Sequence, residues 1–354
     1  MIGKRIEQAR KASGMSMRSL AEKAGISAMA ISKYEREISK PSSSVLLALA
    51  KVLNVKVEYF FRPISAELQE VEYRKQTRLS KKDLGKIQGD VLDQIERYLE
   101  LEQLLPQLPM SQFEIPRSLP KKVTSYDEIE DLAESLRDAW ELGSNPVPDL
   151  MNTLEERGIR VFISELDESQ QFDGLAAKVN GNPVIVVSKY WPSDRQRFTL
   201  AHELGHLIVK DRLETSLDEE KAANRFAGAF LAPKAEVISR LGLERKRLEP
   251  YELGCLKKEY GLSMSGWVYR AFDLHIINQS SFKNMMKFFS MRGWLREEPY
   301  PSCIKEYPAL FEQMVFRALG QDIINESKAA ELLRKPLPEF RRLRAVENDH
   351  AAAD

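Results

Sequence analysis

The sequence predicts an α+β protein, in which an all-helical N-terminal part precedes a mainly helical part with a small β-sheet. Apolar residues recur at helical spacing over most of the chain, whereas short runs rich in β-branched residues occur only in the middle. The segment Asn180-Gly181-Asn182 separates the last two runs and is typical of a tight hairpin turn. The predicted strands are 159–164, 174–179 and 183–188.

The first 60 residues read as several short helices. Gly14 and Gly25 interrupt the apolar pattern, and Ser16 and Ser27 follow at positions suited to cap the next helix. A helix, a glycine turn and two serine-capped helices in this order are typical of a helix-turn-helix, whose second element presents its N-terminal residues to the major groove of DNA. The residues at core spacing are Leu20, Ala21, Ala24, Ile26 and Ile31.

The charge of the chain is unevenly distributed. Lys and Arg together number 53, as do Asp and Glu, yet residues 1–60 contain eleven basic and five acidic residues. A basic first part suits a polyanion such as DNA, although a solvated helical surface has the same composition. No apolar run approaches the length of a membrane span, no signal peptide is recognisable, and the only cysteines are Cys255 and Cys303. We therefore expect a cytoplasmic protein without disulfides or a membrane partner.

The helix-turn-helix interpretation predicts two sets of DNA contacts. Ser16 and Arg18, at the start of one helix, suit contacts with phosphates. The first turns of the next helix suit contacts with base edges. The residues in this second set are Ser27, Ala28, Met29, Ser32 and Lys33.

Residues 3–61 resemble the phage-repressor (Cro/C1, Xre-type) helix-turn-helix family through SLAEKAGIS, ISKYERE and PSSSVLLALAKVLNVKVEYFF. The resemblance implies a homodimer on a palindromic operator in double-stranded DNA, and a buried pair between Arg10 and Glu35 that braces the first helix against the third. Met17 and Ala28 stand where many relatives have glutamine, which suits bidentate contacts with adenine, so no operator sequence follows. The alternative is a helix-turn-helix kept for protein contacts.

The segment His202-Glu203-Leu-Gly-His206 carries the strongest chemical signal. Histidines at i and i+4 lie on one helical face, so both imidazoles can reach one Zn²⁺. Glu203 is placed to act as general base on a metal-bound water. Two of the four histidines of the chain fall in this motif. The alternative, two core histidines bonded to the backbone, would bury a carboxylate between them without a partner.

A catalytic zinc ion needs a third protein ligand and an open coordination position. In the helix predicted over 217–231, Glu220 shares one face with Ala223, Asn224 and Ala227, so it is better placed than its neighbour Glu219 to approach the metal. Asn224, one turn later, is expected to support a ligand. The acidic candidates are Asp211, Glu214, Asp218, Glu219 and Glu220.

Residues 125–277 resemble the ImmA/IrrE family of zinc metallopeptidases through DRQRFTLAHELGHLIV, EKAANRFAGAFLAP and LKKEYGLSMSGWVYRAFDLHII. The resemblance implies His202, His206 and Glu220 as zinc ligands and Glu203 as the catalytic carboxylate. The chain has Leu-Ala-Pro at 231–233 where relatives often have Leu-Met-Pro.

A peptidase also needs a hydrogen-bond donor to the oxyanion of its tetrahedral intermediate, and the sequence does not identify one residue for this role. Tyr251, Tyr260 and Tyr269 all lie downstream of the motif and remain alternatives. His275 is expected to be a packing residue rather than a ligand.

These predictions divide the chain into five parts. Residues 64–105 are charged and have helical spacing, and 106–120 contain four prolines, as in a linker. No motif assigns a role to the C-terminal region. The parts are the helix-turn-helix DNA-binding domain (1–63), a helical connector with a Pro-rich linker (64–122), the ImmA/IrrE-like zinc metallopeptidase domain (123–280), a C-terminal helical region (281–345) and a tail (346–354).

Members of the ImmA/IrrE family commonly cleave an Xre-type repressor. In this chain, a repressor-like domain and a peptidase-like domain occur together. We expect a DNA-binding transcriptional regulator, a repressor, whose zinc metalloendopeptidase cleaves a partner repressor or the chain itself. Self-cleavage would fall in 106–120 or near the DNA-binding domain. In one alternative the zinc domain senses a metal or ligand without proteolysis, and in another an antitoxin-like repressor binds a toxin. The intact Glu203 favours retained chemistry.

Overall fold

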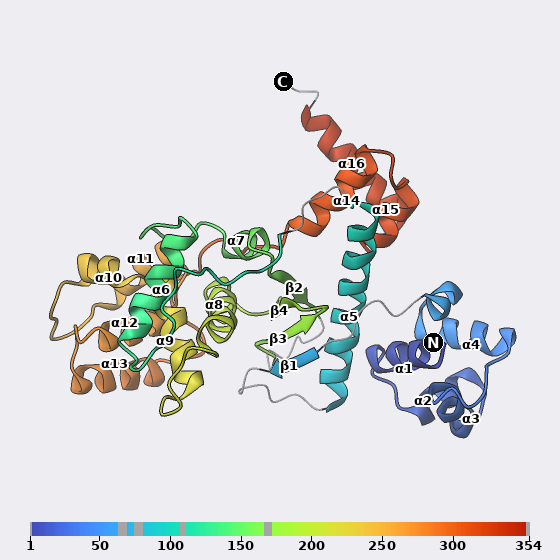
Figure 1. The fold of residues 1–354 in the computed structure, drawn as a ribbon, viewed down its shortest axis with the longest axis horizontal. Helices are drawn as coiled ribbons and strands as arrows, with labels where there is room; N and C mark the ends of the chain where they lie inside the picture. The colour runs from blue at the N-terminus through green and yellow to red at the C-terminus, as the bar shows by residue number, and fades with distance from the viewer. Residues whose placement is uncertain (1, 63–68, 74–80, 107–110, 166–171, 352–354) are drawn as a thin grey trace.

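A computed structural model describes residues 2–62, 69–73, 81–106, 111–165 and 172–351 (Figure 1). Among these residues, no helix is both long and apolar enough to cross a membrane.

The N-terminal helices form the expected helix-turn-helix. Ser16 Oγ accepts a hydrogen bond from Ser19 N and Ser27 Oγ accepts one from Ala30 N, both at 3.1 Å, which confirms the two predicted caps. Gly25 ends the second helix with a φ of 69°, a conformation that suits glycine. The elements are α1 (Ile2–Ala12), α2 (Met17–Ala24), α3 (Ala28–Glu35), α4 (Ser43–Leu53) and a short 3₁₀ helix η1 (Val57–Phe61).

The core of this part is where the apolar pattern places it. Leu20, Ala21 and Ile31 are buried, and Ala24 and Ile26 pack against them partly buried. The guanidinium of Arg10 donates to both carboxylate oxygens of Glu35, at 2.6 and 2.8 Å. The expected brace between α1 and α3 is therefore present.

A four-stranded sheet lies in the middle of the chain, in the order β1-β3-β4-β2. Strands β3 (Gly174–Val179) and β4 (Asn182–Ser188) form an antiparallel hairpin, and β2 (Arg160–Ser164) runs parallel to β4. Asn180 and Gly181 have φ values of 51° and 82°, as a type I′ turn requires, so the predicted hairpin is confirmed.

The fourth strand corrects one prediction. Strand β1 (Gln69–Tyr73) lies within 64–105, where we expected only helix, and it pairs antiparallel with β3. The expected helix is present in the second half of this stretch as α5 (Lys81–Leu104). The strand forms because its partner is about 100 residues away, a contact that local sequence does not encode.

The two faces of the sheet contact different helices. Alternate residues such as Ile185 and Val187 pack on the side of α8 (Ser193–Val209), whereas Leu175, Ala177 and Val186 face the core that contains α5 and α14 (Leu310–Gly320). The sheet therefore separates two apolar layers.

The remaining helices surround α8 or continue the C-terminal layer (Figure 1). The helix expected over 217–231 is confirmed, because α9 spans Glu219–Leu231. These elements are α6 (Glu128–Ala139), α7 (Leu150–Glu156), α9 (Glu219–Leu231), α10 (Lys234–Leu241), α11 (Pro250–Tyr260), α12 (Met264–Asp273), α13 (Gln279–Met291), α15 (Glu326–Leu332) and α16 (Leu337–Ala351).

The helix-turn-helix docks through α1 onto α5 (Figure 1). Gly89 of α5 lies so close to α1 that an added Cβ would be 2.5 Å from the Cβ of Ala12. Arg5 is buried at this contact and forms an ion pair with Glu96. Arg62, at the end of η1, donates to Glu331 of α15 at 2.6 Å. The two halves of the chain are therefore joined by buried and by partly exposed polar contacts. The division into five parts stays a prediction.

Candidate metal centre

Two helices that pack against each other, α8 and α9, position the candidate ligands. Gly205 of α8 faces α9 so closely that an added Cβ would lie 3.1–3.2 Å from backbone atoms of Ala223 and from the ring of Phe226. Ala223 and Ala227 are fully buried, as expected for small residues at a close helix contact. The first turn of α9 therefore lies beside the His202–His206 face of α8.

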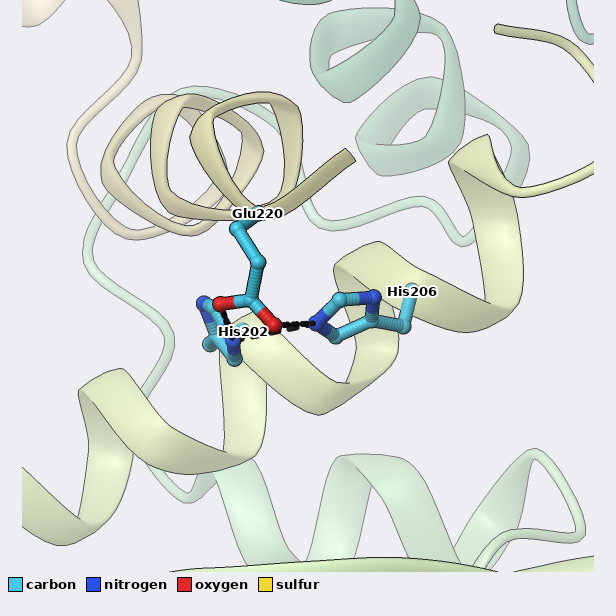
Figure 2. Close-up of side chains that lie close together, drawn as sticks. All are labelled: His202, His206 and Glu220. Atoms are coloured by element: carbon cyan, nitrogen blue, oxygen red, sulfur yellow. Dashed lines mark hydrogen bonds and ion pairs between the residues drawn. The ribbon is translucent and has the colours of Figure 1, made fainter. Parts of the chain in front are cut away.

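Three side chains converge between these helices (Figure 2). The Nε2 atoms of His202 and His206 are 3.1 Å apart. Each Nε2 lies 3.8 Å from one carboxylate oxygen of Glu220. At Zn–ligand distances near 2.1 Å, donors at the corners of a tetrahedron lie about 3.4 Å apart, so this spacing suits one zinc ion between the three side chains. Two imidazoles and a carboxylate are also a donor set that zinc prefers.

The neighbouring acid, Glu219, occupies a different place. Its Oε1 lies 2.8 Å from Nδ1 of His206, the ring nitrogen that points away from the three-residue cluster. Such a carboxylate fixes the imidazole tautomer that leaves Nε2 free to bind a metal. The sequence pattern identified Glu220 as the better ligand but gave no role to Glu219.

The other acidic candidates do not belong to the cluster of three. Asp218 caps α9 by accepting from Lys221 N at 2.9 Å, and Glu214 forms an ion pair with Lys122. Asp211 lines a cavity of about 250 Å³ next to the motif. Asn224, expected to support a ligand, is exposed and lines a second cavity instead.

Glu203 is buried, with 3% of its surface exposed, and it lines the same cavity of about 250 Å³ as His206. The β3–β4 hairpin also lines this cavity, through residues that include Ala176 and Lys178. Phe113 and Ile115 line it as well. These wall residues were not singled out by the sequence, because only the fold brings them to the motif.

The three tyrosines are distinguished by their surroundings. Tyr260 is buried and its hydroxyl lies 3.0 Å from Glu236, and Tyr251 is exposed and packs on Tyr300. Tyr269 lines a cavity of about 560 Å³ together with Phe198, which stands one helical turn before His202. Tyr269 is thus the tyrosine of the three that lies in a cavity reaching α8.

His275 is exposed and has a φ of 59° just after α12, so the expectation that it is a packing residue is wrong. An αL position after a helix is a solvent-facing turn, which explains the exposure.

The predicted DNA contacts lie on the outside of α2 and α3. Ser16, Arg18, Ser27, Met29 and Lys33 are exposed, with 70% of Met29 accessible. Ala28 and Ser32 are partly exposed. The docking contact with α5 is made by α1, which leaves α3 uncovered by the rest of the described chain (Figure 1).

Comparison with known proteins agrees with both parts of this structure. A helix-turn-helix family model matches residues 6–60, and an IrrE N-terminal-like domain model matches residues 154–272. YobD, an uncharacterised HTH-type transcriptional regulator of Bacillus subtilis, is 35% identical over 107 residues, which cover 28% of this chain and 95% of YobD. The chain belongs to the family of HTH-type transcriptional regulators.

Two further regulators of this family are similar over shorter stretches. ImmR of Bacillus subtilis is 29% identical over 93 residues, which are 26% of this chain and 69% of ImmR. SinR of Bacillus licheniformis is 40% identical over 74 residues, which are 21% of this chain and 63% of SinR. The expected combination of an Xre-like helix-turn-helix with an ImmA/IrrE-like domain is therefore confirmed.

Proposed function

We propose that this protein is a cytoplasmic transcriptional repressor that binds DNA and carries a zinc-dependent peptidase, which cleaves a partner repressor or the chain itself. The observation that carries the proposal is the convergence of His202, His206 and Glu220 beside the buried Glu203, in a chain that also contains a helix-turn-helix. A regulator that only sensed zinc would need the three ligands but not the buried general base.

The chemistry follows from the positions of the side chains. A bound zinc ion would polarise the scissile carbonyl and lower the pKa of its bound water. Glu203 is the residue after His202 in the sequence, and it lines the cavity. There its carboxylate accepts a proton from the attacking water and delivers it to the leaving amine. Because Glu203 is almost fully buried, bulk water does not compete for its oxygens.

The DNA-binding half of the proposal is supported by the uncovered α3. Ser27 caps this helix, Met29 lies in its first turn and Lys33 in its last, and all three are exposed. Placed in a major groove, they would reach base edges, while Arg18 would meet a phosphate. Two copies on a palindromic operator would give a homodimer.

Metal content and turnover together test the proposal. We expect about one zinc ion per chain in the purified protein and in Glu203→Gln, and loss of zinc from His202→Ala and Glu220→Gln. Glu214→Gln is a matched control, because this acid pairs with Lys122 outside the cluster. Incubation with zinc and with a candidate repressor should give fragments for the parent and none for Glu203→Gln. Cleavage by Glu203→Gln at the parent rate would contradict the mechanism.

A further inference from the structure

Strand β3 lies next to the candidate catalytic carboxylate. Ala176 and Lys178 are partly exposed and line the cavity of about 250 Å³ that also contains Glu203 and His206. Gly174, on the same face of β3, is close to α8, because an added Cβ would lie 2.8 Å from Cγ2 of Thr199. The strand thus runs alongside the active-site helix.

The outer edge of β3 is covered by β1. The register pairs Gln69 with Lys178 and Glu72 with Ala176, the two β3 residues that line the cavity. Without β1, the sheet order would make β3 the edge strand. Strand β1 therefore lies along the main chain that borders the candidate site.

Strand β1 belongs to neither recognised domain. It lies between the helix-turn-helix match at 6–60 and the IrrE N-terminal-like match at 154–272. The segment that joins the two domains thus supplies the fourth strand of the sheet in the second one.

An open sheet edge beside a peptidase centre binds an extended peptide through main-chain hydrogen bonds. We propose that the edge of β3 is the binding site for an extended substrate segment, and that β1 occupies this site in cis, so that the segment between the domains keeps the cleft closed. The regulatory part rests on the proposed peptidase function, whereas the peptide-binding part does not.

The pairing of β1 has features of a displaceable strand. It is five residues long, and its register shifts between Gln69 and Glu72. Short edge strands with a bulge are weakly held, because few main-chain bonds stabilise them. A partner strand with a continuous register would therefore compete with β1.

The position of β1 couples the site to the DNA-binding domain. Arg62, which lies seven residues before the start of β1, donates a hydrogen bond to Glu331 of α15. After β1 the chain enters α5, on which α1 docks. Release of the docked helix-turn-helix would therefore give β1 more freedom to leave β3.

The test uses the zinc-loaded full chain with the double substitution Glu72→Pro and Tyr73→Pro. These are consecutive residues in regular antiparallel register, so one of the two N–H groups points to β3, and proline removes it. The matched control is Glu72→Ala with Tyr73→Ala, which removes the same side chains and keeps both N–H groups. Thermal melts and zinc content establish that each variant is folded.

Peptide binding is measured in a Glu203→Gln background, with a fluorescein-labelled peptide of residues 67–75 and a scrambled peptide as control. We expect the proline variant to bind the peptide on the order of tenfold more tightly than the parent and the alanine control, because the site is no longer occupied in cis. Equal affinity for all three proteins, or no binding to any, would overturn the inference.

Cleavage of fluorescein-labelled casein separates this inference from the proposed function. If both hold, the proline variant with Glu203 intact cleaves casein faster than the parent. Tighter peptide binding without cleavage of casein or of the candidate repressor would support the β3 site and contradict the peptidase. Should the double variant fail to melt cooperatively, the single variants are compared, and only the one whose N–H faces β3 should bind the peptide more tightly. Identical binding by the two would overturn the inference.

Discussion

Glu219 Oε1 lies 2.8 Å from His206 Nδ1, on the side of the imidazole ring opposite to the nitrogen that faces Glu220. Two consecutive acids at the start of α9 thus take different positions around the same histidine. Glu220 reaches the cluster of candidate ligands, and Glu219 orients one of them. Because α9 begins at Glu219, both acids also lie in its first turn, where the helix dipole favours negative charge.

This arrangement predicts a graded effect on zinc affinity. Glu219→Gln should weaken zinc binding on the order of 10- to 100-fold, because the His206 ring loses the carboxylate that fixes its tautomer. Glu220→Gln should weaken it further, since a ligand atom is changed. Competition with a chelator of known zinc affinity measures both, with Glu214→Gln as the control. Equal affinities for Glu219→Gln and the parent would show that the contact has no role in metal binding.

A second prediction concerns Arg18, exposed near the start of α2. If it contacts a phosphate, Arg18→Ala should weaken binding to duplex DNA of any sequence and reduce the slope of log K against log salt by about 1. Lys258→Ala removes the same charge from the exposed surface of α11 and is the matched control. Fluorescence anisotropy with a labelled non-specific duplex, at several salt concentrations, gives the slope. An unchanged slope would show that Arg18 does not contact a DNA phosphate.

The parts of the site that sequence could predict are those fixed by one helix. The His202–His206 pair follows from the repeat of a helix, and Glu220 follows from the face it shares with Ala223 and Ala227. The caps at Ser16 and Ser27 likewise depend on residues three positions away. Local geometry sufficed in each case.

The parts that could not be predicted depend on distant residues. Strand β1 is stabilised by Lys178, Ala176 and Leu175, and the sequence of β1 alone is charged and resembles the helical stretch around it. Glu306 is another example, since it lies in a region without a motif and yet contacts α7 and α8. Such roles appear only when tertiary contacts are known.

The third prediction follows from that contact. Glu306 accepts from Leu150 N at 3.0 Å and Met151 N at 3.1 Å, and it forms an ion pair with Arg197 of α8, both side chains being buried. Glu306→Ala should lower the free energy of unfolding by about 3–5 kcal/mol, because the guanidinium is left buried without its carboxylate. Urea denaturation followed by circular dichroism measures the loss.

A double variant distinguishes the cost of an unpaired charge from the value of the pair. Arg197→Met with Glu306→Leu should be less destabilised than Glu306→Ala alone, since neither charge remains buried. A double variant less stable than Glu306→Ala would contradict this. It would mean that replacing both side chains costs more stability than leaving the Arg197 guanidinium buried without its carboxylate.

The fourth prediction is a pH dependence of stability that arises from Glu155. This side chain is buried at the end of α7, and its Oε2 accepts from Leu310 N at 3.1 Å. Burial raises the pKa of the Glu155 carboxyl to about 7, against the lowering effect of the backbone hydrogen bonds. The folded protein therefore holds this proton up to a higher pH than the unfolded chain does, and the contribution of Glu155 to stability falls as the pH rises from about 4.5 to above 7.

A pKa shift of this size corresponds to roughly 3 kcal/mol. Glu155→Gln resembles the protonated acid and keeps an acceptor for Leu310 N, so its stability should be close to that of the parent at pH 5 and higher at pH 8. Urea denaturation at both pH values measures the difference between variant and parent, which cancels the contributions of other carboxylates. Glu156→Gln, at the exposed neighbouring position, is the control and should give the same small difference at both pH values. A difference for Glu155→Gln that did not grow between pH 5 and pH 8 would mean that the buried carboxyl ionises in the folded protein as readily as in the unfolded chain.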